Sequence, residues 1–337
     1  MATIYREADA DLSTLVGRRV ALLGAGELAR GLALNLRDAG LPLVVGCTPD
    51  QITPFRVENF EVMPPLDAAQ QADIVWLALP DEVIAECYVQ AVSPALRPGM
   101  ALAFTSGYAL AFGFVEPPSF VDCVLIAPRI PSLRIRDSYL SRAGFPALVA
   151  VEQDATGGAW PLTLALAKAV GGLRVGALET TFRQESELRL FTRQTVWPML
   201  MFALSTAQEL LTQDGYSPEM VLLELSLGGE LADWLQMGGE VGSVNPPSGE
   251  SLTGQYGMLS RLERLTDPKI RRQMELIMDD IRAGKFAQEW ASEYAAGYPR
   301  LDSLKRRRQT LAWQALEQQA IRGWRDRAAN ADGSSEQ

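Results

Sequence analysis

The sequence has 337 residues, 47% of them hydrophobic and 21% charged, which predicts a soluble globular protein of about two domains. Its net charge of −10 argues against nucleic-acid binding, because only a cationic face releases the counterions of phosphate groups. The histidine count is zero, which removes the side chain that most often acts as an acid or base near neutral pH.

The N-terminal segment, MATIYREADADLSTL, lacks the apolar core of a secretory signal, so we expect a cytoplasmic protein. No apolar run in the chain is long enough to cross a bilayer, so no membrane association is predicted. Cys47, Cys87 and Cys123 are far apart in the sequence. We expect them to be reduced and buried, and to form neither disulfides nor a zinc site.

Short apolar runs alternate with helical stretches in the first half of the chain. Helices are expected at 27–40 and 155–172, and strands at 18–26, 41–46, 72–80, 99–107, 121–128 and 145–153. This alternation predicts a parallel, doubly wound sheet.

From about residue 182 the pattern becomes helix after helix. Expected helices are 183–215, bent or divided by Pro198; 217–236, weakened by glycines 228 and 229; and, after a loop at 238–254, 267–286 and 303–324. We therefore predict a Rossmann-type domain (1–181), an all-helical domain (182–327) and a disordered polar tail (328–337). Many dehydrogenases combine two such domains and dimerise through the helical one.

The segment GAGELA follows the first expected strand and opens the first expected helix, which is the context of a dinucleotide-binding turn. Gly24 allows a tight turn, Gly26 lets the backbone approach a pyrophosphate, and Ala29 is small enough for close helix packing. The helix N-terminus, at Glu27 and Leu28, offers unpaired N–H groups to the anion. We expect this turn to bind NAD(H) or NADP(H).

The choice between the two nucleotides depends on the segment CTPDQIT (47–53), which has no Arg or Lys for a 2′-phosphate. Asp50 is either a ribose ligand, which favours NAD, or a simple turn former. Glu27 either interacts favourably with the helix dipole or repels a bound nucleotide. The remaining candidates for cofactor contact follow expected strands: Thr48, Pro80 and Ser106.

Four segments occur in this order along the chain: ADIVWLALPDEV, LRVGALETTF, GYSPEM and DDIRAGKFAQEWASE. Over about residues 4–325, and almost without insertions, the chain resembles class I ketol-acid reductoisomerases, and ETTF and IRAGKFAQEW are the most specific parts of this resemblance. The resemblance implies a Rossmann domain, an interlaced helical domain like that of 6-phosphogluconate dehydrogenase, and a dimer with composite active sites. It also implies a reaction in which two Mg²⁺ ions polarise a 2-hydroxy-2-alkyl-3-oxo acid, an alkyl group migrates and NADPH delivers hydride.

The positions that bind metal in this family have changed. The family's E-T-D-L-F-G-E-Q matches residues 187–194, where the ligating Asp and Glu have become Arg189 and Arg193. Its E-C-L-H-E matches residues 224–228, which keep Glu224 but have Gly228 in place of the second carboxylate. The family's four carboxylates carry a charge of −4, whereas the four residues here give +1. We therefore expect no Mg²⁺ and no isomerase step, which requires a Lewis acid.

Other catalytic motifs of the family are also altered. Its H-G-F-N matches residues 106–109, which retain neither the histidine nor the asparagine, so Tyr108 or a water molecule is predicted to donate the proton. Its A-P-K-G-P-G matches residues 127–132, with Arg129 in place of the lysine. Ser251 matches a substrate-contacting serine of the family, after a loop with a short insertion.

The arginines suggest how a metal-free site would work. Arg189 and Arg193 are four residues apart on an expected helix, so they share a face and suit a carboxylate or phosphate, with Arg129 as a third cation. In the alternative interpretation they are salt-bridged to Glu185 and to Glu224 of the partner subunit, in a site that binds nothing. Arg129, Tyr108 and Ser251 each have a structural interpretation as well.

Three functions remain open at this point. The first is a nicotinamide-dependent reductase of an anionic oxo acid or imine. The second is a non-catalytic relative that binds an anionic metabolite or regulates a true reductoisomerase. The third is a lyase or isomerase that needs no hydride.

Overall fold

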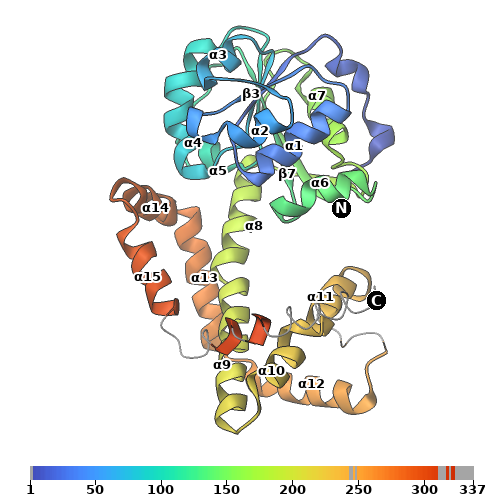
Figure 1. The fold of residues 1–337 in the computed structure, drawn as a ribbon, viewed down its shortest axis with the longest axis vertical. Helices are drawn as coiled ribbons and strands as arrows, with labels where there is room; N and C mark the ends of the chain where they lie inside the picture. Colours follow the sequence, from blue (N-terminus) through green and yellow to red (C-terminus); the bar gives the residue numbers. More distant parts are fainter. Residues whose placement is uncertain (1–2, 243–245, 247–248, 310–315, 319, 323–337) are drawn as a thin grey trace, which may run out of the picture. The chain divides into compact units, whose positions relative to one another are not determined.

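The computed structural model describes residues 3–242, 246, 249–309, 316–318 and 320–322, and the chain divides into two compact units between Arg189 and Leu190 (Figure 1). The expected tail at 328–337 lies outside the described residues. Within the described residues, no helix is both long enough and apolar enough to span a membrane.

The first unit contains a nine-stranded sheet of order β1-β9-β8-β7-β6-β5-β2-β3-β4. The strands are β1 (Ile4–Tyr5), β2 (Val20–Leu23), β3 (Leu43–Gly46), β4 (Glu61–Met63), β5 (Ile74–Leu77), β6 (Ala101–Phe104), β7 (Asp122–Pro128), β8 (Ala147–Gln153) and β9 (Ala177–Glu179). The neighbouring strands β7, β6, β5, β2, β3 and β4 are all parallel to one another, as the alternating pattern predicts.

The predicted parallel arrangement does not extend to the other edge of the sheet. Strand β8 runs antiparallel to β7, and β1 runs antiparallel to β9. A parallel neighbour requires a crossover, usually a helix that passes over the sheet. The link between β7 and β8 contains α6 but returns to the end of the sheet that it left, and its two ends are joined by the Arg129 amide, which donates to the Pro146 carbonyl at 2.8 Å.

Helices cover both faces of this sheet (Figure 1). Because successive strand residues point to opposite faces, Leu22 packs with α1 and α7 whereas Leu23 packs with α3 and α4. The helices of this unit are α1 (Glu27–Asp38), α2 (Thr53–Val57), α3 (Pro65–Gln70), α4 (Asp81–Cys87), α5 (Tyr108–Ala111), α6 (Ile135–Leu140) and α7 (Ala159–Val170). All residues of β2 and β5 are buried, as expected for strands covered on both faces.

The rest of the described chain is helical. Its elements are α8 (Phe182–Gln194), α9 (Val196–Gln213), α10 (Pro218–Leu222), the π-helix η7 (Leu223–Leu227), α11 (Glu230–Val241), α12 (Leu252–Leu265), α13 (Pro268–Arg282), α14 (Lys285–Ala295) and α15 (Pro299–Gln309). The expected division near Pro198 occurs at Thr195, because a proline ring clashes with the carbonyl four residues earlier and so α8 ends at Gln194.

The predicted weak point at the glycine pair is confirmed, since Gly229 has a φ of 82° and separates η7 from α11. Other helix limits differ from the prediction. The expected loop at 238–254 is shorter, because α11 continues to Val241 and α12 begins at Leu252. The expected helix at 267–286 ends at Arg282, and Gly284, with a φ of 72°, precedes α14.

Candidate functional site

A cleft of about 940 Å³ opens at the carboxyl ends of the parallel strands in the first unit. Strand β2 lies between β3 and β5. After β2 the chain adds β3 and β4 on one side of it, and then β5, β6 and β7 on the other side. Open α/β sheets bind ligands at such a reversal. Seven of the residues predicted from the sequence line the cleft: Gly26, Glu27, Leu28, Asp50, Pro80, Ser106 and Arg189.

The glycine turn between β2 and α1 has the geometry of a nucleotide-binding turn. Gly24 has a φ of 135°, and a Cβ there would lie 2.4 Å from the Ala78 carbonyl oxygen, so only glycine fits. Gly26 precedes the first residue of α1, and a Cβ there would meet no atom within 4 Å. The backbone of Gly26 therefore lies open to the cleft, while Ala29 is buried beneath the turn.

Charges around this turn are partly balanced. Glu27 lies 3.8 Å from Arg30, which also forms an ion pair with Glu58. Thr48 is exposed and precedes the short 3-10 turn Pro49–Gln51, and it is not among the residues that line the cleft. Among the described lining residues, Arg189 is the one cation.

Arg129 forms a buried ion pair instead of lining the cleft. The Oε1 atom of Glu185, whose side chain is completely buried, accepts from Arg129 Nη2 at 2.7 Å. The Oε2 atom of Glu185 accepts from the Gly107 amide at 2.7 Å. Gly107 packs so tightly that a Cβ would lie 2.2 Å from the Phe182 carbonyl oxygen. Arg129 thus fastens the end of β7 to the first turn of α8, which is the structural role foreseen as its alternative.

Tyr108 is likewise buried outside the cleft. Its ring stacks on Phe114 with centroids 5.6 Å apart, and its hydroxyl has no hydrogen-bond partner among the described residues. Burial, and then the charges of Asp81 and Glu82, raise the pKa of the Tyr108 hydroxyl well above its ordinary value. The structure therefore does not bring the predicted proton donor to the cleft.

The sequence motifs did not single out Asp81, a half-buried acid of the cleft whose Oδ1 atom is buried. It is the first residue of α4, directly after Pro80, and it lines the cleft together with Ser106 and Arg189. Burial raises the pKa of Asp81 to about 6, although a hydrogen bond with the Ser106 side chain and the Arg189 charge act in the opposite direction. The signal was present in the sequence, because a carboxylate directly after a strand of a parallel sheet lies at the ligand-binding edge.

The other predicted residues belong to helices of the second half. The Arg193 guanidinium lies over the Trp197 ring, 5.2 Å from its centroid, and Glu224 is exposed within η7. Ser251 caps α12 by accepting from the Gly254 amide at 3.0 Å. Ser251 and Gly228 also line a smaller cleft of about 390 Å³.

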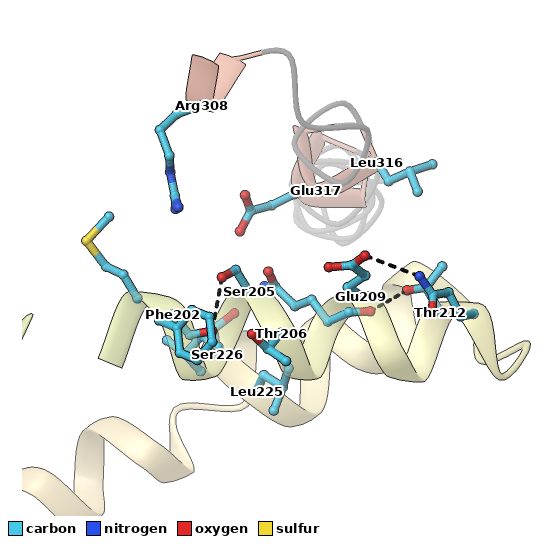
Figure 2. Close-up of a pocket in the computed structure, with 14 residues that line it drawn as sticks. Phe202, Ser205, Thr206, Glu209, Thr212, Leu225, Ser226, Arg308, Leu316 and Glu317 are labelled. Atoms are coloured by element: carbon cyan, nitrogen blue, oxygen red, sulfur yellow. Dashed lines mark hydrogen bonds between the residues drawn. The ribbon is translucent and has the colours of Figure 1, made fainter. Parts of the chain in front are cut away.

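The helical unit has a further cavity of about 730 Å³, formed by α9, η7 and segments near residues 308 and 317. Figure 2 shows Ser205, Thr206 and Glu209 along α9, with Arg308 and Glu317 above them. The Thr212 hydroxyl donates to the Gln208 carbonyl, and Gln213 donates to Glu209, so these polar groups bond within their own helix. None of the predicted site residues lines this cavity.

A Rossmann-type sheet with a glycine turn at its ligand-binding edge, followed by a helical region, defines the class of nucleotide-binding oxidoreductases to which this chain conforms. Residues 14–176 match the family model for the NADPH-binding domain of acetohydroxy acid isomeroreductase. Residues 182–324 match the model for the C-terminal domain of ketol-acid reductoisomerase. The chain belongs to the ketol-acid reductoisomerase family, which confirms the resemblance seen in the sequence.

Individual relatives agree with this assignment. The ketol-acid reductoisomerase (NADP(+)) of Caldivirga maquilingensis is 39% identical over 307 residues, covering 90% of this chain and 93% of the relative. That of Kineococcus radiotolerans is 37% identical over 308 residues and 90% of each chain. The solved NADH-preferring ketol-acid reductoisomerase from an uncultured archaeon is 30% identical, with a TM-score of 0.88 over 95% of this chain and 98% of its own. The predicted fold class is therefore confirmed.

Proposed function

We propose that this protein is a metal-independent NAD(P)H-dependent reductase of an anionic oxo acid or imine, without the isomerase step of its family. The observation that carries this proposal is Arg189, which lines the nucleotide-type cleft at a position where the family has a metal-binding carboxylate. A guanidinium there replaces a site for a cation with a site for an anion.

The donor set does not fit two Mg²⁺ ions, which require several oxygen ligands. Arg189, Arg193 and Gly228 replace three of the four family carboxylates, and only Glu224 is kept. A side chain at position 228 would also be crowded, because a Cβ there would lie 2.9 Å from the Leu223 carbonyl oxygen. Within the part of the chain that the structure describes, no three His, Cys, Asp or Glu side chains are grouped so as to hold a metal ion.

The glycine turn fits a dinucleotide. The open backbone at Gly26 and the N–H groups at the start of α1 suit a pyrophosphate, and the Arg30 pair reduces the repulsion from Glu27. Asp50 and Gln51 line the cleft where a 2′-phosphate would need a cation, which favours NADH over NADPH. A bound reduced nicotinamide would supply hydride to a carbonyl or imine carbon.

The substrate-binding group in this proposal is Arg189. A planar guanidinium forms paired hydrogen bonds with a carboxylate, which holds a 2-oxo acid in a fixed orientation. The Arg189 charge also polarises a neighbouring carbonyl group, a role that the family assigns to metal ions. Arg129 acts only indirectly, because its pairing with Glu185 fixes the first turn of the helix that carries Arg189.

We propose further that the chain assembles as a homodimer or a larger homo-oligomer with composite sites. Large apolar side chains are exposed on the helices of the second unit, among them Phe202 on α9 and Leu259 and Leu262 on α12. Exposed apolar surface of this kind is typical of a subunit interface.

The decisive experiment is a titration of the protein with NADH and with NADPH, followed by nucleotide fluorescence and thermal stability, with and without Mg²⁺. We expect NADH to bind and to stabilise the protein equally with and without Mg²⁺. Absence of any effect at millimolar nucleotide would contradict the reductase and leave the non-catalytic anion-binding relative. Turnover of 2-acetolactate that depends on Mg²⁺ would show that the isomerase reaction persists.

A further inference from the structure

Asp81 is a half-buried carboxyl group in the cleft that the proposed function has not used. We infer that Asp81 carries the proton that the reduction consumes, and that it takes up this proton together with the anionic substrate. The inference rests on the proposed reductase function, since it identifies the acid of the same cleft.

The position of Asp81 supports this role. Pro80 ends the segment after β5, and Asp81 begins α4, so the backbone holds the carboxyl group at the carboxyl ends of the paired strands β2 and β5. Its Oδ1 atom is buried without a hydrogen-bond partner among the described residues. An unpaired buried oxygen is costly as a carboxylate but acceptable as part of a carboxylic acid, so the site favours protonation.

Charged and titratable groups face Asp81 from three helices. Arg189 and Glu185 come from α8, Glu82 from α4 and Tyr108 from α5. Glu185 is already engaged by Arg129 and the Gly107 amide, so Arg189 is the cation that stabilises ionised Asp81. An anionic substrate on Arg189 would bring a second negative charge beside Asp81, and the pair of like charges would favour protonation of Asp81.

Substrate binding and proton uptake are therefore linked. The pKa of Asp81, about 6, leaves roughly a tenth of the carboxyl groups protonated at pH 7 when no anion is bound. If an anion raises this pKa to about 8, the complex gains about 0.8 of a proton at pH 7. The substrate thus arrives with the acid that its reduction requires.

A bound reduced nicotinamide would supply hydride to the substrate carbon and would itself be oxidised, while the O–H bond of the Asp81 carboxyl would break. That proton goes to the carbonyl oxygen, or to the imine nitrogen, which gives an alcohol or an amine. Asp81 is left as a carboxylate and is reprotonated by water when the next anion binds.

Isothermal titration with oxalate, a dicarboxylate that cannot be reduced, tests the linkage without any nucleotide. Measured at pH 7 in two buffers with different ionisation enthalpies, the wild-type protein should take up more than about half a proton per oxalate. Asp81→Asn should still bind oxalate, with uptake near zero. Asp67→Asn is the matched control, because Asp67 also lies in the first turn of a helix after a proline but is not among the residues that line the cleft. It should behave as wild type.

Two results would overturn the inference: failure of the wild-type protein to bind oxalate, or proton uptake that persists in Asp81→Asn. Circular dichroism of both variants verifies that they fold. A protein that fails to bind NADH but shows uptake abolished by Asp81→Asn would refute the reductase and leave the linkage intact. If NADH does bind, Asp81→Asn should lower kcat about 100-fold or more with little change in KM.

Discussion

Glu185 is a completely buried carboxylate that forms an ion pair with the Arg129 guanidinium. Replacing Glu185 by Gln would leave Arg129 without its counter-charge, and breaking such a pair costs more than losing an exposed one. We expect Glu185→Gln to lower the free energy of unfolding by about 2 to 3 kcal/mol, measured by urea denaturation.

The exposed pair between Arg300 and Glu289, at 2.8 Å, provides the comparison. Glu289→Gln should cost less than about 1 kcal/mol, because water screens both charges. Equal effects of the two substitutions would show that the Glu185 pair contributes no more than a surface ion pair.

Gly24 and Gly26 both lack a Cβ atom, but the space around the two positions differs. Gly24→Ala should destabilise the protein by about 2 to 3 kcal/mol, since the backbone has a positive φ and the Ala78 carbonyl blocks a Cβ. Gly26→Ala should cost no more than about 1 kcal/mol, yet lower NADH affinity at least about tenfold, because the methyl group points into the open cleft. Thermal denaturation and fluorescence titration separate the two effects. A Gly26→Ala variant with unchanged NADH affinity would place the pyrophosphate elsewhere.

Burial of Asp81 also has a consequence for stability. Its pKa rises from the model-compound value of 3.8 to about 6 on folding, so the folded state holds the proton more tightly than the unfolded state. Stability from this group is therefore present below pH 3.8 and is lost as the pH rises through 6. Asp81→Asn should be more stable than wild type above pH 6, by up to about 3 kcal/mol, and the difference should shrink towards pH 4. Denaturation at several pH values measures this, and a difference that does not change with pH would contradict it.

Sequence motifs located two kinds of residue in the cleft. Gly26 was found because its backbone belongs to the glycine turn, and Arg189 because it matches a position of the family motif. The motifs did not single out Asp81: its place after a strand was visible in the sequence, but the rise in its pKa comes from burial in the fold. They also left Arg129 open, because its partner Glu185 is 56 residues further along the chain. Only the folded sheet and α8 bring those two side chains together.

At the level of the element, α8 carries Arg189 and Arg193, on which the proposed metal-free site depends. The variant Arg189→Asp with Arg193→Glu restores two carboxylates on this helix. We expect it to lose oxalate binding and to gain stabilisation by Mg²⁺, about 1.4 kcal/mol at a tenfold excess over Kd, while wild type gains none. Thermal unfolding with and without MgCl₂ is the measurement.

A variant with the same net charge change, Arg271→Asp with Arg272→Glu on α13, provides the control. It should bind oxalate as wild type does and show no response to Mg²⁺. Mg²⁺ stabilisation of wild type, or of this control, would contradict the dependence of the metal-free site on α8.

The sequence predicted the end of a helix where a residue with a restricted or unusual backbone conformation determines it. Pro198 and Gly229 are two such residues. The direction of β8 was not predicted, since its apolar pattern is the same in parallel and antiparallel pairing. The π-helical turn at Leu223–Leu227 was also missed, because it depends on the Gly228 amide, which donates to the Leu223 carbonyl at 2.9 Å.

For the whole molecule, the proposed dimer makes a direct prediction about mass. Sedimentation equilibrium should give at least twice the 36.8 kDa of one chain. Phe202→Asp, at a side chain that is 70% exposed on α9, should shift the protein towards monomer. Val57→Asp, at a site 77% exposed in the sheet unit, should leave the mass unchanged. A wild-type monomer would refute the assembly and the composite site with it.

The order of a sheet followed by helices could be predicted at this scale, because hydrophobic periodicity changes along the chain near residue 182. The pairing order of the strands and the antiparallel edge depend on contacts between distant segments, which periodicity does not contain.

The close packing of Gly107 against Phe182 bears on how such a site can diverge. Tolerance to mutation is unevenly distributed along this segment. Position 107 permits no side chain, and its amide is tied to Glu185. The neighbouring positions 106, 108 and 109 differ from the family's H-G-F-N without altering that backbone anchor. A backbone anchor of this kind lets the neighbouring side chains change while the local fold is preserved, which leaves an intact scaffold open to a new reaction.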